Sequence, residues 1–233
     1  MDAAFVLVHS PSVGPLTWQP VAERLTGSGR VAVVPSLLGV ADAGPPFWPA
    51  VVSAVTAAVP ADVPVVLVAH SNAGLFVPVV ADALRRPVAG CVFVDAAIPA
   101  RIGPTPVLSP DLLDVLRPMV AADGRLPQWT SWFDEADVAQ MFPDRRTRQA
   151  VSDEQPRLPF TYYEQRVPVP AGWDRMPCGY LLFGPPYEKA AADARGRGWD
   201  VGEVPGHHLH QIVDPETVTA RIVALADRWL GRS

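Results

Sequence analysis

The sequence predicts an α/β protein with a doubly wound, mostly parallel sheet and an inserted helical cap. Short, continuous apolar runs alternate with longer amphipathic stretches along most of the 233-residue chain. Continuous apolarity is typical of strands buried on both faces, and strand–helix alternation is typical of a parallel sheet covered by helices. One long stretch near the middle lacks strand-like runs, which indicates a helical insertion rather than a structureless loop.

Six runs of β-branched or aliphatic residues, each bounded by turn residues, are the expected strands: 4–8, 31–34, 65–69, 91–94, 179–183 and 201–204. Apolar spacing between them predicts helices at 18–25, 48–59, 73–84, 188–195 and 215–230. The last helix has the clearest start. Asp214 is a suitable N-cap, Pro215 fits the first helical position and Glu216 fits the first turn.

Residues 1–96 and 176–233 are expected to form one core, interrupted by the helical cap at 97–175. Short helices are predicted there, and no strand is expected; the helices fall at 110–122, 135–142 and 144–154. Aromatic and sulfur-containing side chains concentrate in this stretch: Trp129, Trp132, Phe133, Met141, Phe142, Phe160, Tyr162, Tyr163 and Trp173. Most are expected to be ordinary core. A cap over the carboxyl edge of a parallel sheet would nevertheless enclose a crevice lined by apolar rings.

Composition excludes several classes of protein. Hydrophobic residues make up 49% of the chain and charged residues 18%, which excludes a disordered protein. The formal net charge of −5 gives no indication of binding to nucleic acid or anionic lipid, so a small molecule is the expected partner. Cys91 and Cys178 lie in apolar runs and are expected to be buried thiols. The first apolar run, 4–8, is too short for a signal peptide or membrane span, so the cytoplasm is the expected location.

Ser71 gives the strongest chemical signal, because it lies between the buried run 65–69 and a helical pattern. With the small residues Ala69 and Ala73 two places to either side, it fits a nucleophile elbow, although the G-x-S-x-G pattern has glycine at both places. So tight a turn would hold Ser71 in a strained, exposed conformation. The start of the helix would direct backbone N–H groups at a developing oxyanion. The alternative is that Ser71 only caps the helix.

The segment His9-Ser10-Pro11, directly after the first expected strand and followed by Trp18, resembles the α/β-hydrolase superfamily. It is similar to the branch of esterases and hydroxynitrile lyases, including plant salicylate methyl esterases. The resemblance implies a small serine hydrolase whose oxyanion hole uses this loop and the N–H of Asn72. Ser10 stands where glycine is usual, and Pro11 has no N–H, so Ser10 would have to supply the first donor. The alternative is that His9 and Ser10 only organise the loop.

A general base is needed to accept the Ser71 proton, and histidine suits neutral pH. The resemblance places this histidine between the last strand and the last helix, seven residues before a proline that opens the helix. His208 satisfies this spacing with Pro215, and His207 is the alternative. A metal site built on these neighbouring histidines lacks an accompanying carboxylate or cysteine spacing, so no metal is expected.

Two positions compete for the acid that would orient the histidine. The resemblance implies Gly-x-x-Asp after the penultimate strand, but the sequence has Tyr187 at that place and Glu188 one residue later. Some haloalkane dehalogenases carry the acid at the end of the strand after the elbow helix, where this chain has Asp95. We favour Asp95, because a carboxylate between a buried strand and the cap needs a partner such as His208. The alternative is that Asp95 caps a turn.

Together these residues predict a serine hydrolase that cleaves an ester, thioester or lactone of a small, largely apolar substrate through an acyl-enzyme. Ser71, His208 and Asp95 would form the triad, with Ser10 and Asn72 at the oxyanion. The motifs for nucleotide binding are absent, so no cofactor is expected. Two alternatives remain open: a lyase or cyclase that uses Ser71 and His208 as acid and base, and a non-catalytic ligand-binding protein.

Overall fold

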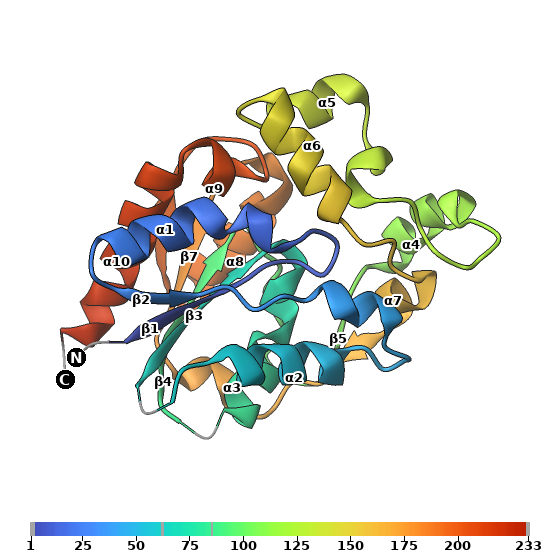
Figure 1. Ribbon diagram of the computed structural model, residues 1–233. Coiled ribbons are helices and arrows are strands. Elements are labelled where there is room, and N and C mark those ends of the chain that lie inside the picture. The colour runs from blue at the N-terminus through green and yellow to red at the C-terminus, as the bar shows by residue number, and fades with distance from the viewer. Residues whose placement is uncertain (1–2, 62, 85, 232–233) are drawn as a thin grey trace.

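The computed structural model describes residues 3–61, 63–84 and 86–231, and its centre is a six-stranded sheet (Figure 1). The strand order is β2-β1-β3-β4-β7-β8, and every neighbouring pair is parallel. This confirms the predicted doubly wound parallel sheet. The strands are β1 (Ala4–Val8), β2 (Val31–Val33), β3 (Val65–His70), β4 (Val88–Val94), β7 (Cys178–Leu182) and β8 (Asp200–Glu203).

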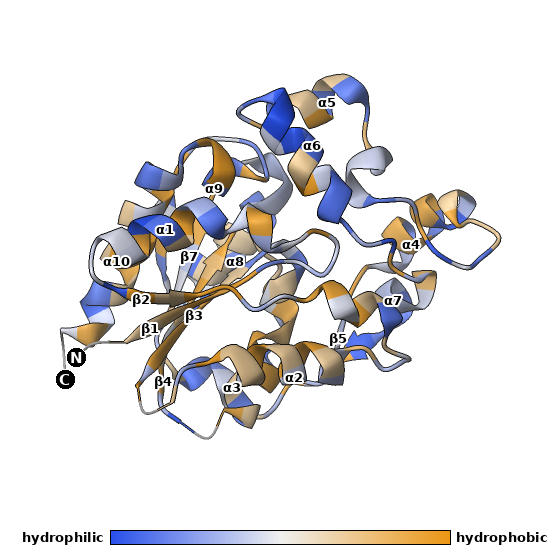
Figure 2. Ribbon diagram, in the orientation of Figure 1, coloured by the Kyte–Doolittle hydropathy of each residue, from blue (hydrophilic) through white to orange (hydrophobic). Residues whose placement is uncertain are grey.

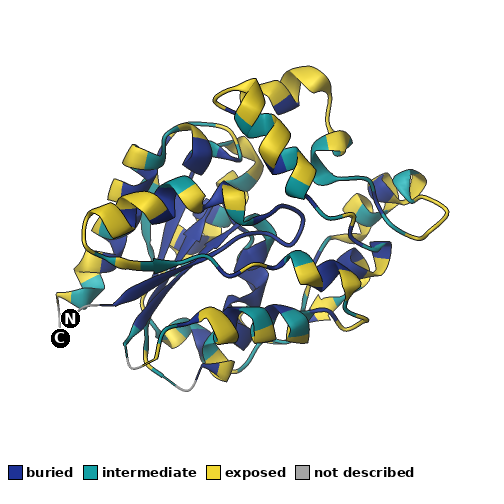
Figure 3. Ribbon diagram, viewed as in Figure 1, coloured by how far each residue is buried: buried dark blue, intermediate teal, exposed yellow. Residues whose placement is uncertain are grey.

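Helices cover both faces of the sheet. On one face lie α1 (Gln19–Gly27) and α10 (Pro215–Leu230), and on the other lie α2 (Trp48–Ala58), α3 (Val77–Ala83) and α8 (Glu188–Gly196) (Figure 1). Figure 2 shows the hydrophobic strands between these layers, and Figure 3 shows that the strands are buried while the helices turn one side to solvent. The helix α10 starts as predicted, because the Thr217 N–H donates to the Asp214 carboxylate at 3.0 Å.

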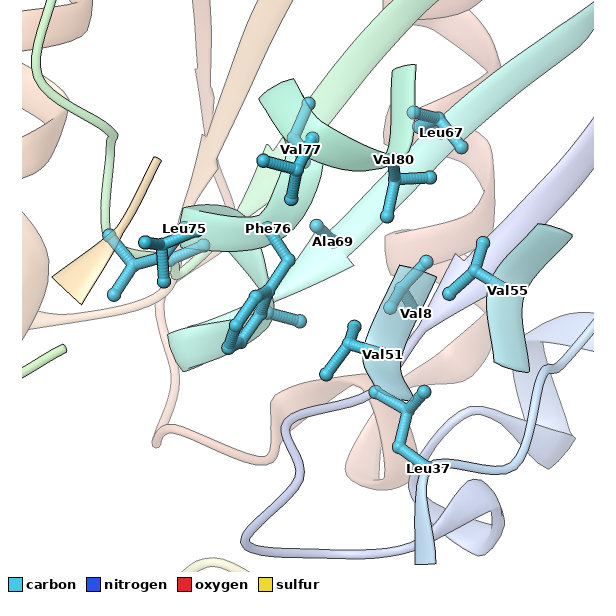
Figure 4. Close-up of a cluster of buried hydrophobic side chains, with 14 of the residues drawn as sticks. Val8, Leu37, Val51, Val55, Leu67, Ala69, Leu75, Phe76, Val77 and Val80 are labelled. Carbon is cyan, nitrogen blue, oxygen red and sulfur yellow. The ribbon is translucent and has the colours of Figure 1, made fainter. Parts of the chain in front are cut away.

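Two hydrophobic cores hold these layers together, because successive side chains of each strand point to opposite faces. Val6 and Val8 of β1 belong to the core under α2 and α3, whereas Phe5 and Leu7 belong to the core under α1 and α10. Figure 4 shows part of the first core, which includes Val8 of β1 and Val51 of α2. Apolar burial on both faces is the main force that fixes the sheet.

Prolines break two of the predicted helices. The helix expected over 110–122 ends as an α-helix at Leu116 and continues as a 3₁₀ helix (Arg117–Met119), because Pro118 has no N–H to donate. In place of a single helix over 73–84, a 3₁₀ helix (Ser71–Phe76) precedes α3. The physical reason is Pro78, which has no N–H to donate to the carbonyl of Gly74, so an α-helix could not run unbroken through this turn.

The 97–175 segment contains α4 (Pro110–Leu116), α5 (Glu135–Gln140), α6 (Arg145–Glu154) and α7 (Phe160–Glu164), gathered beyond the carboxyl ends of the strands (Figure 1). The expectation of no strand here is wrong, because β5 (Thr105–Pro106) pairs antiparallel with β6 (Arg166–Val167). Each strand is two residues long and one contains proline, so neither leaves an apolar run in the sequence. In the part of the chain that the structure describes, no helix is long and apolar enough to cross a membrane.

Substituting Gly74 by alanine tests how tightly the chain packs behind Ser71. A methyl group at this position would overlap the backbone carbonyl oxygen of Ala97, whereas a methyl group at Gly27, at the end of α1, would meet nothing within 4 Å. We expect Gly74→Ala to lower the free energy of unfolding by about 1–3 kcal/mol, because the strand end must move to make room. The matched Gly27→Ala should leave stability unchanged or raise it slightly. Urea unfolding followed by tryptophan fluorescence measures both, and equal stabilities would contradict the packing argument.

Candidate active site

The carboxyl edge of the sheet gathers the polar residues singled out in the sequence. Ser10 follows β1, Ser71 follows β3, Asp95 follows β4 and His208 lies in the loop after β8. Since parallel strands all end at the same edge, residues that are far apart in the chain meet there.

Ser71 occupies a strained turn between β3 and the 3₁₀ helix. Its φ of 59° lies in the left-handed region, which costs a non-glycine residue about 1–3 kcal/mol. Ala69 and Ala73 are fully buried to either side, so larger side chains would have no space. The Ser71 carbonyl also accepts the Ala97 N–H at 3.0 Å, which ties the turn to the end of β4. The local geometry is that of a nucleophile elbow.

Ser71, His208 and Asp95 form a chain of hydrogen bonds. His208 Nε2 lies 2.9 Å from Ser71 Oγ, and His208 Nδ1 lies 2.6 Å from Asp95 Oδ2. A carboxylate on Nδ1 fixes the proton there and leaves Nε2 free to accept a proton from the serine. The two competing residues lie elsewhere: His207 is exposed, and Glu188 is an exposed residue at the start of α8.

Asp95 is buried, with 1% of its surface exposed, and its backbone is also left-handed, with a φ of 42°. Its Oδ1 accepts the N–H groups of Phe183 at 3.0 Å and Gly184 at 3.4 Å, directly after β7. The Tyr180 hydroxyl makes two hydrogen bonds to the backbone of Ala96, the residue after Asp95. It accepts from the Ala96 N–H at 3.0 Å and donates to the Ala96 carbonyl at 2.8 Å. The sequence analysis missed Tyr180, because it lies inside an apolar strand where nothing marks its hydroxyl.

Two further side chains hold His208 in place, His70 through the backbone and Tyr187 through the ring, and the sequence analysis assigned neither of them to the site. His70 donates from Nε2 to the His208 carbonyl at 2.7 Å, and the two rings lie 4.5 Å apart. Burial lowers the pKa of His70 well below its usual value, which keeps this ring neutral. Tyr187 stacks on His208 at 5.0 Å with the ring planes 9° apart, and its hydroxyl lies 3.3 Å from Ser71 Oγ. Adjacency to Ser71 was the only sequence signal for His70.

The loop after β1 is held by its own hydrogen bonds. His9 accepts the Leu37 N–H on Nε2 at 3.0 Å and donates from Nδ1 to the Ser10 carbonyl at 2.8 Å. Burial lowers the pKa of His9 to about 4, so it stays neutral and organises the loop. Ser10 Oγ accepts the Ser12 N–H at 3.2 Å, a bond that does not use the hydroxyl hydrogen of Ser10. Ser10 and Asn72 both line the same cavity as Ser71.

A cavity of about 250 Å³ opens onto Ser71, between the sheet edge and the 97–175 segment. Leu108 and Leu209 line it together with five of the aromatic and sulfur-containing residues noted in the sequence: Trp129, Trp132, Phe133, Met141 and Tyr163. The other four residues of that set (Phe142, Phe160, Tyr162 and Trp173) are buried in the hydrophobic cores. No Asp, Glu, Lys or Arg lines the cavity within residues 3–61, 63–84 and 86–231.

Two adjacent tyrosines of α7 connect the 97–175 segment to the site. The Tyr162 hydroxyl donates to Asn72 Oδ1 at 2.7 Å, and the Tyr163 hydroxyl lies 2.9 Å from Ser12 Oγ. Burial raises the pKa of both phenols, so both stay protonated. The residue after Ser71 and the loop after β1 are therefore anchored to the same helix.

Among the residues with described positions, no group of three His, Cys, Asp or Glu side chains could hold a metal ion.

Solved structures of low sequence identity have the same fold. An extracellular alpha/beta-hydrolase from a Paenibacillus species superposes with a TM-score of 0.73 at 17% identity, covering 96% of this chain and 99% of that one. Tomato methylketone synthase I gives a TM-score of 0.71 at 12% identity, with 98% and 99% covered. Polyneuridine aldehyde esterase gives 0.65 at 16% identity, with 97% and 100% covered. No curated protein sequence matches the chain at a significant level.

A family model spanning almost the whole chain agrees with this fold. The model of the alpha/beta hydrolase family matches residues 5–221, which include the strand before Ser10, the Ser71 turn and the His208 loop. The chain therefore belongs to the alpha/beta hydrolase family.

Proposed function

We propose that this protein is a serine hydrolase that cleaves an ester, thioester or lactone of a small, largely apolar substrate. One observation carries the proposal: the unbroken chain of hydrogen bonds from Ser71 through His208 to the buried Asp95, with distances of 2.9 and 2.6 Å. This geometry matches the roles of nucleophile, general base and orienting acid.

In the proposed reaction, Ser71 Oγ attacks the substrate carbonyl carbon while His208 Nε2 takes the hydroxyl proton. Asp95 stabilises the resulting imidazolium. The Asn72 N–H and Ser10 would hold the oxyanion of the tetrahedral intermediate. His208 then returns the proton to the leaving group as the carbon–leaving-group bond breaks, and water repeats the sequence to release the acid.

The cavity supports a neutral substrate, because no charged side chain of the described residues lines it. In this proposal the 97–175 segment acts as a cap that supplies the apolar walls. Esterase and pyrethroid hydrolase structures share the fold, which agrees with ester cleavage. Cys91 and Cys178 are buried free thiols, which fits a cytoplasmic protein, and that location stays a prediction.

A lyase or cyclase is the second candidate. Pro11 favours it, because the loop after β1 lacks an N–H donor at the residue after Ser10. A methylketone synthase has the same fold. In such an enzyme Ser71 and His208 would move protons without forming an acyl-enzyme. A ligand-binding protein without catalysis is the third candidate.

Covalent labelling separates these candidates. We expect a fluorophosphonate to add once to the wild-type protein, not at all to Ser71→Ala, and slowly to His208→Ala, because only an activated serine displaces fluoride. Intact-mass spectrometry measures the adduct. His207→Ala is the matched control and should label like the wild type. An unlabelled wild type would contradict the hydrolase proposal and favour the other two candidates.

Asp95→Asn tests the identity of the acid. The amide oxygen can still accept the Phe183 N–H, but the amide NH₂ would face His208 and move its proton to Nε2, where it blocks proton transfer from Ser71. We expect kcat for an aryl ester to fall by about 10³- to 10⁴-fold with the fold retained. Steady-state kinetics and circular dichroism measure both effects. Glu188→Gln should behave as the wild type, and a large loss in that variant would assign the acid to Glu188.

The charge of the substrate gives another test. We expect kcat/KM for a neutral short-chain or aryl ester to exceed that for the same ester bearing a carboxylate on its acyl group by about 100-fold or more, since the cavity offers no partner to a buried anion. Parallel kinetics on the two esters measure the ratio. Comparable values would contradict an apolar acyl site.

A further inference from the structure

The Tyr187 hydroxyl lies beside the reacting serine, 3.3 Å from Ser71 Oγ, at the wall of the cavity. Its ring stacks on His208 at 5.0 Å, with the two planes 9° apart. The hydroxyl is therefore close both to the nucleophile and to the base that would serve it. Neither the proposed triad nor the oxyanion hole uses this group.

The position of Tyr187 is fixed by its backbone. It ends a 3₁₀ helix (Pro185–Tyr187) in which two consecutive prolines restrict the chain, and its N–H donates to the Gly184 carbonyl at 3.2 Å. Burial raises the pKa of Tyr187 to about 12. Near neutral pH the phenol is therefore protonated and is available as a hydrogen-bond donor.

The sheet order indicates on which side of Ser71 the Tyr187 hydroxyl lies. Strand β1, which leads to the Ser10 side of the oxyanion hole, lies on one side of β3, while β4 and β7 lie on the other. Tyr187 follows β7, so it leaves the sheet on the side opposite Ser10. It lies instead next to His208, whose Nε2 must deliver a proton to the leaving group.

We infer that Tyr187 is a further catalytic residue that donates a hydrogen bond to the leaving oxygen of the substrate, and that the substrate is an oxygen ester of an unactivated alcohol. This inference rests on the proposed serine hydrolase function. An alkoxide leaving group gathers much negative charge and gains from a second donor beside His208. A thiolate gains little, because sulfur is a weak acceptor.

Acylation requires no proton from Tyr187, because His208 carries the only proton that is transferred. The Ser71 Oγ–carbon bond forms, and the Ser71 proton passes to His208 Nε2. The carbon–alkoxy bond then breaks with its electron pair on the leaving oxygen, which receives that proton from His208. Tyr187 keeps its own proton and only holds the oxygen. In deacylation a water molecule takes the place of the alcohol and accepts the same hydrogen bond.

Tyr187→Phe tests the inference, since it removes the hydroxyl and keeps the ring on His208. We expect kcat/KM to fall by about 10- to 100-fold for an alkyl ester. It should fall by less than about 3-fold for the p-nitrophenyl ester and the alkyl thioester of the same acyl group, because these leaving groups need little assistance. The variant would therefore depend more steeply on leaving-group pKa than the wild type. Tyr180→Phe is the matched control, because its hydroxyl supports the backbone after Asp95, and its loss should be uniform across the three substrates.

Fluorophosphonate labelling of Ser71 in the same proteins separates the possible failures. A labelled Tyr187→Phe variant with wild-type kinetics, or with an equal loss on all three substrates, would overturn this inference and leave the hydrolase proposal intact. Equal loss would mean that Tyr187 only supports the His208 ring. A wild-type protein that neither labels nor turns over any ester would overturn the proposed function and this inference with it.

Discussion

The arrangement of the site depends on the buried carboxylate of Asp95. A carboxylate in an apolar interior is costly unless its oxygens are hydrogen-bonded. Here Oδ1 accepts the N–H groups of Phe183 and Gly184, and Oδ2 is paired with His208. The ends of β4 and β7 and the loop after β8 therefore meet at one group. Because His208 also reaches Ser71, the same carboxylate sets the geometry at the end of β3.

The two positive φ angles in the site show how the sheet supports this arrangement. Ser71 and Asp95 each hold a backbone conformation that costs about 1–3 kcal/mol, and the carbonyl of Ser71 is tied to the N–H of Ala97. Such strain persists only where the surroundings determine the chain path. The strands that lead into both turns are buried on both faces, so neither turn can relax without disturbing the hydrophobic cores.

The parallel sheet could be predicted from the sequence, because strands buried on both faces leave continuous apolar runs. The helix break at Pro78 was missed, because the helical spacing of apolar residues continues on both sides of that proline. The small neighbours of Ser71 indicated the elbow, and the end of an apolar run indicated Asp95. The role of Tyr180 could not be predicted, because a hydroxyl within an apolar strand has no pattern. Contacts of this kind depend on which loops meet in space rather than on spacing along the chain.

The placement of the acid and the presence of Tyr187 are physically coupled. The family resemblance implies a carboxylate at position 187, whereas the carboxylate that contacts His208 in the structure belongs to Asp95, directly after β4. Two carboxylates beside His208 in an apolar cavity would repel each other, and one would have to bind a proton. With Asp95 in contact with His208, a neutral side chain at position 187 avoids this repulsion. The phenol of Tyr187 is neutral, and its hydroxyl lies 3.3 Å from Ser71 Oγ, so the acid and the additional donor that we propose can occupy one site beside His208 without repelling each other.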